Sequence, residues 1–310
     1  MRAIIQHRFG GPEVLEVAEV PPPVPLPTEI VVEVKAVGVN PVETIIRSGA
    51  FPMIGQPPFI LGWDVSGVVT EVVPGVNRFR PGDEVFGMPM FPRAANAYAE
   101  YVAAPARHFA LKPANIDHAE AAALPLAGLT AWQGLVDVAR IGPGQRLLIH
   151  GIAGGVGLIA LQIAKERGAH VVGTASAPKH ELLYRLGADE LIDYRTTDFA
   201  EQVRDMDVVL ETIGGDYGER SLRTLRPGGL LFTAVGRNDR ALAAKAEAAG
   251  MRFAGISVEP DCQGLEALAA LVEKGALHPH VERRLPFEQA SLAHELVASG
   301  HTTGKIVLIP

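Results

Sequence analysis

Apolar residues in the first third of the chain fall in short Val-rich runs that partly alternate with polar residues. Two of these runs, 29–40 (EIVVEVKAVGVN) and 64–73 (DVSGVVTEVV), predict β-strands. Glycines and Pro-Gly pairs interrupt this part of the chain about every ten residues, as in PPPVPLP and VPGVNRFRPGD. Short strands between frequent turns are typical of a small β-barrel, so we expect a barrel here rather than a helical domain.

The pattern changes near Asp117, where an Ala- and Leu-rich segment with helical spacing begins. Asp117 is a candidate N-cap because Glu120 follows three residues later, the spacing of a capping box. Farther along, short apolar runs alternate with helical segments. The predicted strands are 146–150, 170–174, 190–192, 207–211, 229–235 and 253–258, and the predicted helices begin near 155, 178, 217 and 240. Six short strands with helical spacers indicate a doubly wound parallel sheet.

The last segment, which starts near Gly264, contains two more helical stretches and a final apolar run, GKIVLIP. A single strand needs a sheet to pair with, so we expect this tail to return to the first domain. The sequence thus predicts an α/β protein of two domains. Residues 1–123 and 261–310 form the barrel domain, and residues 124–260 form the parallel-sheet domain.

A glycine-rich turn joins the first parallel strand to its helix in RLLIHGIAGGVGLIALQIAKERG. Its glycines are Gly151, Gly154, Gly155 and Gly157, which do not form a strict G-x-G-x-x-G because Ile152 stands at the first place. The position of the turn nevertheless favours nucleotide binding, since it opens a series of alternating strands and helices. Unpaired N–H groups and the helix dipole at such a turn attract anions. We expect it to hold the pyrophosphate of a dinucleotide.

The residues after the second parallel strand indicate which dinucleotide binds. Sites for NAD place a carboxylate about 20 residues after the glycine turn, where it accepts a hydrogen bond from the ribose 2′-hydroxyl. Here the segment reads GTASAPKH and contains Thr174, Ser176 and Lys179 but no carboxylate. Tyr194 and Arg195, after the third strand, are candidates for the same pocket. Hydroxyls and cations in place of a carboxylate favour NADPH over NADH.

Composition narrows the possible function classes. The 310 residues are 48% hydrophobic and 20% charged, with a formal net charge of −7, as in an ordinary soluble globular protein. Nucleic-acid binding needs clustered basic residues, and the one such cluster, HPHVERR around Arg283 and Arg284, is interpreted as a solvated turn. The single cysteine, Cys262, excludes an internal disulfide and a multi-thiolate zinc site. No apolar stretch has the roughly 20 residues of a membrane span, so we expect a cytoplasmic protein.

Five motifs together resemble the medium-chain dehydrogenase/reductase superfamily, and within it the zinc-free quinone oxidoreductases related to zeta-crystallin. These motifs are GVVTEVVPGVNRFRPGDEVFG, LPLAGLTAW, HGIAGGVG, LRPGGLLFTAVG and GKIVL, and the resemblance extends over essentially the whole chain. It implies a GroES-like β-barrel catalytic domain and a doubly wound Rossmann domain that binds NADPH.

The resemblance also implies a set of functional residues. Asn40 is the expected catalytic residue, beside the nicotinamide and the substrate, and Phe51 and Trp63 are expected to line the substrate pocket. Thr130 would lie near the nicotinamide ribose, and Lys305 would close the pocket. The full set of expected cofactor-binding residues is Asn40, Pro41, Thr130, Gly151, Gly154, Gly155, Val156, Gly157, Thr174, Ser176, Lys179, Tyr194, Ile213, Gly214, Val235, Gly236 and Lys305.

Two departures from related enzymes restrict the chemistry. Zinc-dependent alcohol dehydrogenases have Cys where this chain has Asn40, and a His-Glu pair where it has Trp63 and Asp64. A catalytic zinc needs about three protein ligands, so we expect no metal. Related enoyl-thioester reductases carry a tyrosine proton donor in G-x-Y-P, whereas this chain reads GAFP with Phe51. Phe51 has no proton to give, and we expect it to form an apolar wall.

The reaction that these features predict is hydride transfer from NADPH to an electron-poor carbon, in a quinone ring or at the β-carbon of an enone. Either acceptor spreads the added negative charge onto an oxygen, where hydrogen-bond donors stabilise it. The side-chain amide of Asn40 and the nicotinamide ribose hydroxyl are the candidate donors. Water is the expected source of the final proton, since no Tyr or His occupies an evident motif position.

Two other function classes remain open: a structural or RNA-binding protein related to zeta-crystallin, and a subunit that binds NADPH without turnover. The acidic net charge argues against RNA binding. His150, at a predicted strand end, is interpreted as a structural core histidine rather than a base. The run 251–258 (MRFAGISV) is expected to be an edge strand, which invites pairing with a second copy. The resemblance likewise implies a homodimer.

Overall fold

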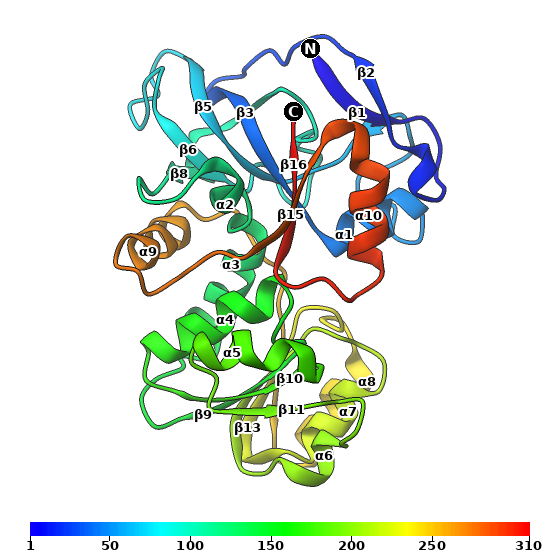
Figure 1. Cartoon of the computed structure of the whole chain (residues 1–310), viewed down its shortest axis with the longest axis vertical. Helices are drawn as coiled ribbons and strands as arrows, with labels where there is room; N and C mark the ends of the chain where they lie inside the picture. The colour runs from blue at the N-terminus through cyan, green and yellow to red at the C-terminus, as the bar shows by residue number, and fades with distance from the viewer. The chain divides into compact units, whose positions relative to one another are not determined.

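The structure, a computed structural model of residues 1–310, divides into two units that are described separately (Figure 1). Unit 1 comprises Met1–Leu129, Glu259–Gly275 and Pro279–Pro310, and unit 2 comprises Thr130–Val258 and Ala276–His278. Unit 1 therefore extends six residues beyond the boundary expected after residue 123 and resumes two residues before the expected 261. The first difference arises because Leu129 packs closely on Gly264 and so belongs with unit 1.

Unit 2 is built on one sheet in which all the neighbouring strands are parallel. In spatial order its six strands are β11 (Glu190–Ile192), β10 (His170–Thr174), β9 (Arg146–His150), β12 (Met206–Glu211), β13 (Leu225–Thr233) and β14 (Arg252–Gly255). The chain builds outward from β9 in one direction and then returns to build in the other, which is the doubly wound order. The predicted parallel sheet is confirmed, and β14 is one of its edges.

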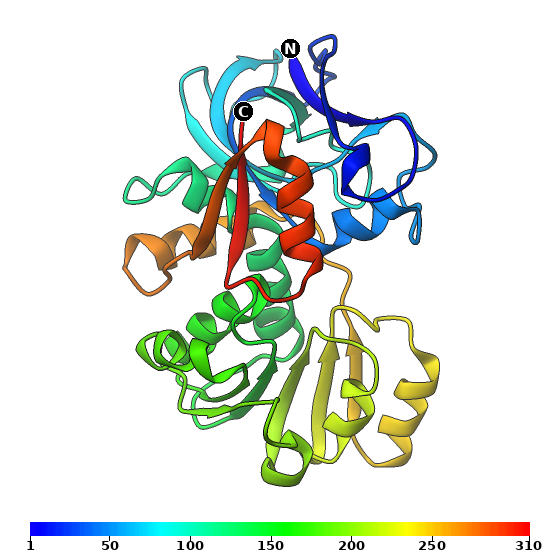
Figure 2. The ribbon, with the colours of Figure 1, turned by 45° about the vertical axis from the view of Figure 1, so that its right-hand side comes forward.

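Helices cover both faces of this sheet, as the green and yellow ribbons of Figure 2 show. They are α4 (Gly155–Glu166), α5 (His180–Arg185), α6 (Phe199–Gln202), α7 (Tyr217–Leu222) and α8 (Arg240–Ala248). On one face Leu148, Val172 and Val209 from three strands pack with Phe199 of α6 and Tyr217 of α7. Because both faces are buried, the strands read as continuous apolar runs rather than alternating ones.

Unit 1 contains two sheets that are largely antiparallel. The smaller has the order β2 (Glu16–Glu19), β1 (Arg2–Gln6) and β4 (Phe59–Ile60). The larger has the order β15 (Val281–Pro286), β16 (Lys305–Ile309), β3 (Glu29–Val39), β5 (Asp64–Val72), β6 (Glu84–Gly87) and β8 (Phe109–Leu111), with β7 (Tyr101–Pro105) also paired to β3. A bridge between Ala3 and Ala99 joins β1 to the segment that leads into β7. The tail returns as predicted, because β16 pairs with β3.

The hydrophobic pattern of the sequence did not reveal one of the helices of unit 1, the helix labelled α1 (Pro41–Ser48). The helices of this unit are α1, α2 (His118–Ala122), α3 (Pro125–Trp132, which runs on into unit 2), α9 (Cys262–Glu273) and α10 (Ala290–Ala298). The predicted capping box is present at α2, where Asp117 and Glu120 each accept the other's backbone N–H. Helix α1 starts with Pro41 at its first position and ends at Gly49, whose φ of 88° suits glycine.

The interpretation of Arg283 and Arg284 as part of a solvated turn is wrong. Both residues are exposed, but they lie on β15, which pairs in parallel with β16 through Arg284 and Val307. Charged side chains are tolerated on this strand because β15 is an edge with an exposed face. None of the helices combines the length and apolarity needed to cross a membrane.

Candidate functional site

The glycine turn of unit 2 lies between the end of β9 and the start of α4. Gly151 has a φ of +61°, a conformation that favours glycine. A Cβ on Gly157 would approach the carbonyl oxygen of Gly151 to 2.5 Å, so this position also excludes a side chain. Helix geometry leaves the N–H groups of the first residues of α4, Gly155 to Gly157, without intrahelical acceptors. This glycine-rich turn, followed by N–H groups without intrahelical acceptors, fits a pyrophosphate.

The other residues of unit 2 that are predicted to bind the nucleotide lie at the carboxyl ends of neighbouring strands, as the glycine turn does. Thr174 ends β10, while Ser176 and Lys179 follow it. The residues that follow the carboxyl ends of β11, β12 and β13 are Tyr194, Ile213, Gly214, Val235 and Gly236. Three of these have large apolar or aromatic side chains left 42%, 51% and 53% exposed, namely Tyr194, Ile213 and Val235. Only Thr130 lies elsewhere, buried near the end of α3.

One acidic residue, Asp193, lies near the expected 2′-phosphate pocket. Asp193 follows β11, and its carboxylate accepts the backbone N–H of Ala177 at 3.2 Å and that of Arg195 at 3.0 Å. The hydrogen bond from Arg195 lowers the pKa of Asp193. Its oxygens therefore tie together the loops that carry Lys179 and Tyr194. A carboxylate that selects NAD would instead follow β10.

A buried carboxylate holds the loops after β12 and β13. Glu211, the last residue of β12, accepts the backbone N–H groups of Ile213 and Gly214, the latter at 2.7 Å. Its other oxygen accepts the hydroxyl of Thr233 at 3.1 Å. The hydroxyl oxygen of Thr233 in turn accepts the N–H of Gly236 at 3.1 Å. Glu211 thus holds both of the loops that are expected to contact the nucleotide. In the sequence, Glu211 and Thr233 are evident only as polar residues at or near the ends of apolar strands.

Unit 1 contains a buried group of polar side chains around Asn40, which we call the Asn40 cluster. Its members are Asn40, Glu43, Asp64, Tyr98, His294 and Lys305, none of which is more than 6% exposed. Sheet register brings three of them together, since Gly38 faces Asp64 and Val39 faces Ile306 across β3. The cluster therefore assembles from segments distant in sequence.

Every polar atom of the Asn40 side chain has a partner within the cluster. Its Oδ1 accepts a hydrogen bond from Lys305 Nζ. Its Nδ2 donates to Asp64 Oδ2 at 2.9 Å and lies 3.4 Å from Glu43 Oε1. Lys305 also pairs with Asp64 at 3.0 Å, and the second oxygen of Asp64 accepts the N–H of Leu126 at 2.6 Å. The result is a buried ion pair that fixes the orientation of the Asn40 amide.

Glu43 links this ion pair to two further buried groups. It accepts the backbone N–H of Asn40 at 2.8 Å and the hydroxyl of Tyr98 at 2.6 Å. Tyr98 also contacts His294 Nε2 at 3.1 Å. Burial raises the pKa of Glu43 to about 7, although the hydrogen bond from Tyr98 lowers it. Burial, together with the charge of Arg47, lowers the pKa of His294 to about 3.

The remaining predicted residues of unit 1 differ in their surroundings. Pro41 is exposed at the start of α1, and Phe51 is 40% exposed in the loop that follows it. Trp63 is fully buried, donates its indole N–H to the carbonyl of Arg93 at 2.7 Å and packs edge-on against Phe91. The Trp63 ring is therefore part of the core. Glu43 was signalled by its capping-box distance from Asn40, whereas Tyr98 and His294 carried no local signal.

The raised pKa of Glu43 predicts a pH-dependent difference in stability between the wild type and Glu43→Gln. Protonated Glu43 contributes stability that is fully present below the unfolded value of 4.5 and is lost as pH rises through about 7. The wild type should therefore lose about 3 kcal/mol relative to the variant between pH 4.5 and pH 8. Urea unfolding of both proteins across this range measures the difference. Parallel stability curves would contradict the assignment.

Comparison with known proteins identifies relatives of the whole chain. The family model described as "Alcohol dehydrogenase GroES-like domain" matches residues 26–114, and that described as "Zinc-binding dehydrogenase" matches residues 186–308. The quinone oxidoreductase of Mus musculus is 32% identical over 326 residues, which cover 100% of this chain and 98% of the relative.

Two solved structures resemble the fold closely. The quinone oxidoreductase from Coxiella burnetii has a TM-score of 0.95 and 33% identity, with coverage of 100% of this chain and 99% of that one. The Escherichia coli quinone oxidoreductase complexed with NADPH has a TM-score of 0.89 and 33% identity, and 100% of both chains is covered. With its GroES-like unit 1 and Rossmann unit 2, the chain therefore belongs to the quinone oxidoreductase group of the medium-chain dehydrogenase/reductase superfamily.

Proposed function

We propose that this protein is a zinc-independent, NADPH-dependent reductase that transfers hydride to a quinone or an α,β-unsaturated carbonyl compound. The observation that carries the proposal lies at the carboxyl ends of the strands of unit 2, where a glycine-rich turn lies beside loops that offer Ser176, Lys179 and Tyr194. The E. coli relative complexed with NADPH supports the same cofactor. Quinone oxidoreductases among the relatives support the first acceptor class.

The residues of unit 2 fit NADPH in distinct ways. The N–H groups of Gly155, Val156 and Gly157 would bind the pyrophosphate, and Lys179 would pair with the 2′-phosphate. The exposed side chains of Ile213 and Val235 offer apolar surface to the rings of the nucleotide. When bound, NADPH supplies the hydride. The chain's own task is to hold the cofactor in a fixed position and to limit the access of water.

The contacts within the Asn40 cluster change which residue is proposed to donate a hydrogen bond to the oxygen of the substrate. Both hydrogens of the Asn40 amide point at protein acceptors, Asp64 and Glu43. An ammonium has three donors, and Lys305 uses two of them on Asn40 and Asp64. We therefore propose that Lys305 stabilises the negative charge that develops on the acceptor oxygen, and that Asn40 positions Lys305. The proton that completes the reduction would come from water.

The same cluster supports zinc independence. No group of three His, Cys, Asp or Glu side chains is placed to hold a metal ion. Beside Asn40 stand the carboxyl groups of Asp64 and Glu43 and the ammonium of Lys305, whose charge would repel a metal cation. The zinc in the description of the matched family model is thus not accompanied by a suitable set of ligands in this chain.

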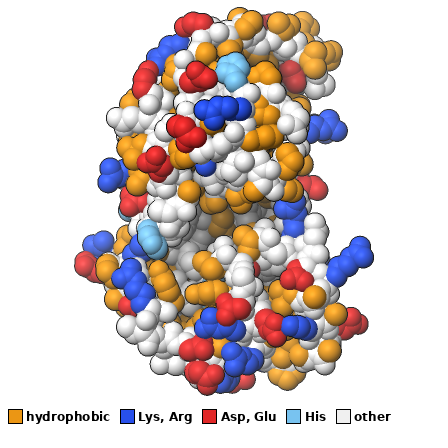
Figure 3. All heavy atoms as spheres, turned by 90° about the vertical axis from the view of Figure 1, so that its right-hand side faces the viewer, with side chains coloured by type: hydrophobic (Ala, Val, Ile, Leu, Met, Phe, Trp, Pro, Cys, Tyr) orange, Lys and Arg blue, Asp and Glu red, His pale blue; other side chains and the backbone are white.

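The surface supports a small-molecule substrate rather than a nucleic acid. Lys and Arg are interspersed with Asp and Glu over the face drawn in Figure 3, and no large area of one sign is present on it. Nucleic-acid binding needs a clustered basic surface. The formal net charge of −7 is also unfavourable for a polyanionic partner.

Turnover measurements with a panel of acceptors test the proposed function. The purified protein should oxidise NADPH with a series of quinones and of unsaturated aldehydes and ketones, and the relative kcat/KM values would identify the preferred class. Metal analysis of the same sample should find no stoichiometric zinc. Absence of binding to NADPH, or activity that disappears on chelation and returns with zinc, would refute the proposal.

Lys179→Ala should weaken NADPH binding with little effect on NADH. Loss of one charge-assisted hydrogen bond to the 2′-phosphate should raise the KM for NADPH about 10- to 100-fold. NADH has no 2′-phosphate, and its KM should change by less than about twofold on the same reasoning. Steady-state kinetics with both cofactors measure the ratio. An equal rise for both cofactors would place Lys179 outside the 2′-phosphate pocket.

Lys305→Met should lower kcat by about 100- to 1,000-fold, the usual cost of removing an oxyanion donor. Because this variant leaves Asp64 buried without its partner, the double variant Lys305→Met/Asp64→Asn serves as a charge-balanced companion. The affinity of both variants for NADPH, measured by fluorescence titration, should stay within about threefold of the wild type. A double variant with wild-type kcat would assign Lys305 a structural role only.

The edge position of β14 supports a homodimer. One side of Arg252–Gly255 pairs with β13, and the outer side has no neighbouring strand. We propose that a second copy of the chain pairs with this side. Light scattering should then give twice the chain mass of 32.9 kDa. A wild-type monomer would exclude the dimer.

A further inference from the structure

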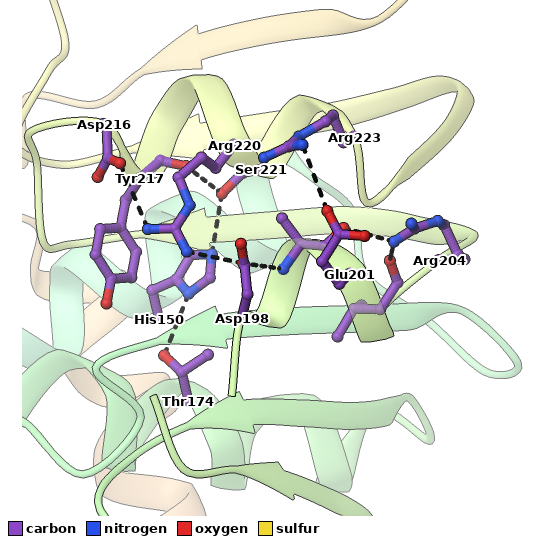
Figure 4. A network of polar contacts seen from close by, with 12 residues as sticks. His150, Thr174, Asp198, Glu201, Arg204, Asp216, Tyr217, Arg220, Ser221 and Arg223 are labelled. Atoms are coloured by element: carbon purple, nitrogen blue, oxygen red, sulfur yellow. Dashed lines mark hydrogen bonds and ion pairs between the residues drawn. The ribbon is translucent and has the colours of Figure 1, made fainter. Parts of the chain in front are cut away.

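His150, the last residue of β9, lies fully buried between the glycine turn and α7. Its ring packs against Phe199 and Tyr217, with centroid distances of 4.4 Å and 5.1 Å. Figure 4 shows the ring joined to Thr174 on one side and to Ser221 on the other. Nδ1 lies 3.2 Å from Thr174 Oγ1, and Nε2 lies 2.9 Å from Ser221 Oγ. Both ring nitrogens are thus engaged, as expected of a core histidine.

The two ends of this contact series determine its direction. At one end the backbone N–H of Gly151 donates to Thr174 Oγ1 at 3.3 Å, and at the other Ser221 Oγ donates to the carbonyl of Tyr217 at 2.6 Å. An N–H can only donate and a carbonyl can only accept. The Thr174 hydroxyl is therefore left to donate to Nδ1 of His150, and Ser221 to accept from Nε2–H. All five groups are satisfied in this single arrangement.

We propose that His150, with its proton on Nε2, is a positioning residue that holds the dinucleotide turn through a directed chain of hydrogen bonds from α7 to the N–H of Gly151. The proposal deepens the proposed NADPH function and rests on it. The hydrogen bond from the Gly151 N–H to Thr174 fixes the orientation of the peptide group at the start of the turn. The N–H groups of Gly155 to Gly157, which follow in α4, are then presented together.

A further contact of His150 extends this positioning to the loop after β12. The Thr212 hydroxyl donates to the backbone carbonyl of His150 at 2.9 Å. Thr212 directly precedes Ile213, and Ser221 lies on the helix that follows this loop. His150 therefore connects the turn expected to bind the pyrophosphate with a loop expected to contact the adenosine or the nicotinamide. Displacing the ring should disturb both.

Burial and the charge of Arg220 oppose protonation of the His150 ring. The Arg220 guanidinium lies over the Phe199 ring, 4.7 Å from its centroid, and is paired with Asp198 at 2.8 Å and with Asp216 at 3.5 Å. Burial, together with the charge of Arg220, lowers the pKa of His150 to about 3. A second ring proton would also face the donor hydroxyl of Thr174. The chain therefore keeps one direction across the neutral pH range.

Substitutions of His150 separate the hydrogen bonds from the volume of the ring. Gln offers one acceptor and one donor at a similar separation to the two ring nitrogens and should preserve the chain, whereas Leu fills the space without either group. We expect His150→Leu to weaken NADPH binding about 10- to 100-fold and His150→Gln to remain within about threefold of the wild type. His170→Leu is the matched control, because His170 lies at the end of β10 opposite to Thr174. This variant should bind NADPH as the wild type does.

The readouts do not depend on turnover. Fluorescence titration with NADPH gives the affinities, and urea unfolding reports stability separately. Nitrogen-15 NMR of labelled histidine should find His150 protonated on Nε2 and unchanged between pH 8 and pH 5. Ser221→Ala, which removes the acceptor of Nε2–H, should weaken NADPH binding about 3- to 10-fold and mix the two tautomers, and it provides a second route if the Leu variant does not fold.

Three results would overturn the positioning role: a ring proton on Nδ1, an NADPH affinity of folded His150→Leu or Ser221→Ala equal to that of the wild type, or a Gln variant as weak as the Leu variant. Each leaves the proposed function intact as long as the wild type binds NADPH. Failure of the wild type to bind NADPH would instead remove the proposed function, and the NMR measurement would still test the hydrogen-bond chain.

Discussion

Backbone N–H groups at the carboxyl ends of parallel strands have no further strand to accept their hydrogen bonds, and this constraint organises unit 2. Side chains that end the strands satisfy some of these groups, as Thr174 does for Gly151 and Glu211 does for Gly214. The first turn of α4 keeps a set of N–H groups without intrahelical acceptors. The loops at the carboxyl ends of the strands are therefore held by hydrogen bonds, and the first turn of α4 is left available to an anion.

Unit 1 meets a different constraint, the cost of burying charge. The ammonium of Lys305 is tolerated in the core because Asp64 pairs with it and Asn40 supplies a further acceptor. Glu43 has hydrogen-bond donors around it but no cation at hydrogen-bond distance, which is consistent with its raised pKa. The same arrangement that satisfies these groups also orients the Lys305 ammonium, so stability and the proposed chemistry depend on the same contacts.

Local pattern was sufficient for much of the fold. The strand–helix alternation after residue 146 has boundaries within a few residues of those observed, because parallel strands buried on both faces form short continuous apolar runs. Helix α1 was missed because its short amphipathic segment lies between strands, and its only signs are Pro41 and Glu43 at the helix start. Strand β15 was not predicted because its charged side chains give no apolar pattern. It forms through its pairing with β16.

The sequence alone determined the parallel-sheet unit, the glycine turn and the absence of a carboxylate after β10, because each depends on residues close together in the chain. Tertiary structure decided which side chains meet. The contacts of Asn40 with Asp64 and Lys305, and of His150 with Ser221, join residues that are 24, 265 and 71 positions apart. Such contacts arise from sheet register and helix packing, and a local sequence pattern carries no record of them.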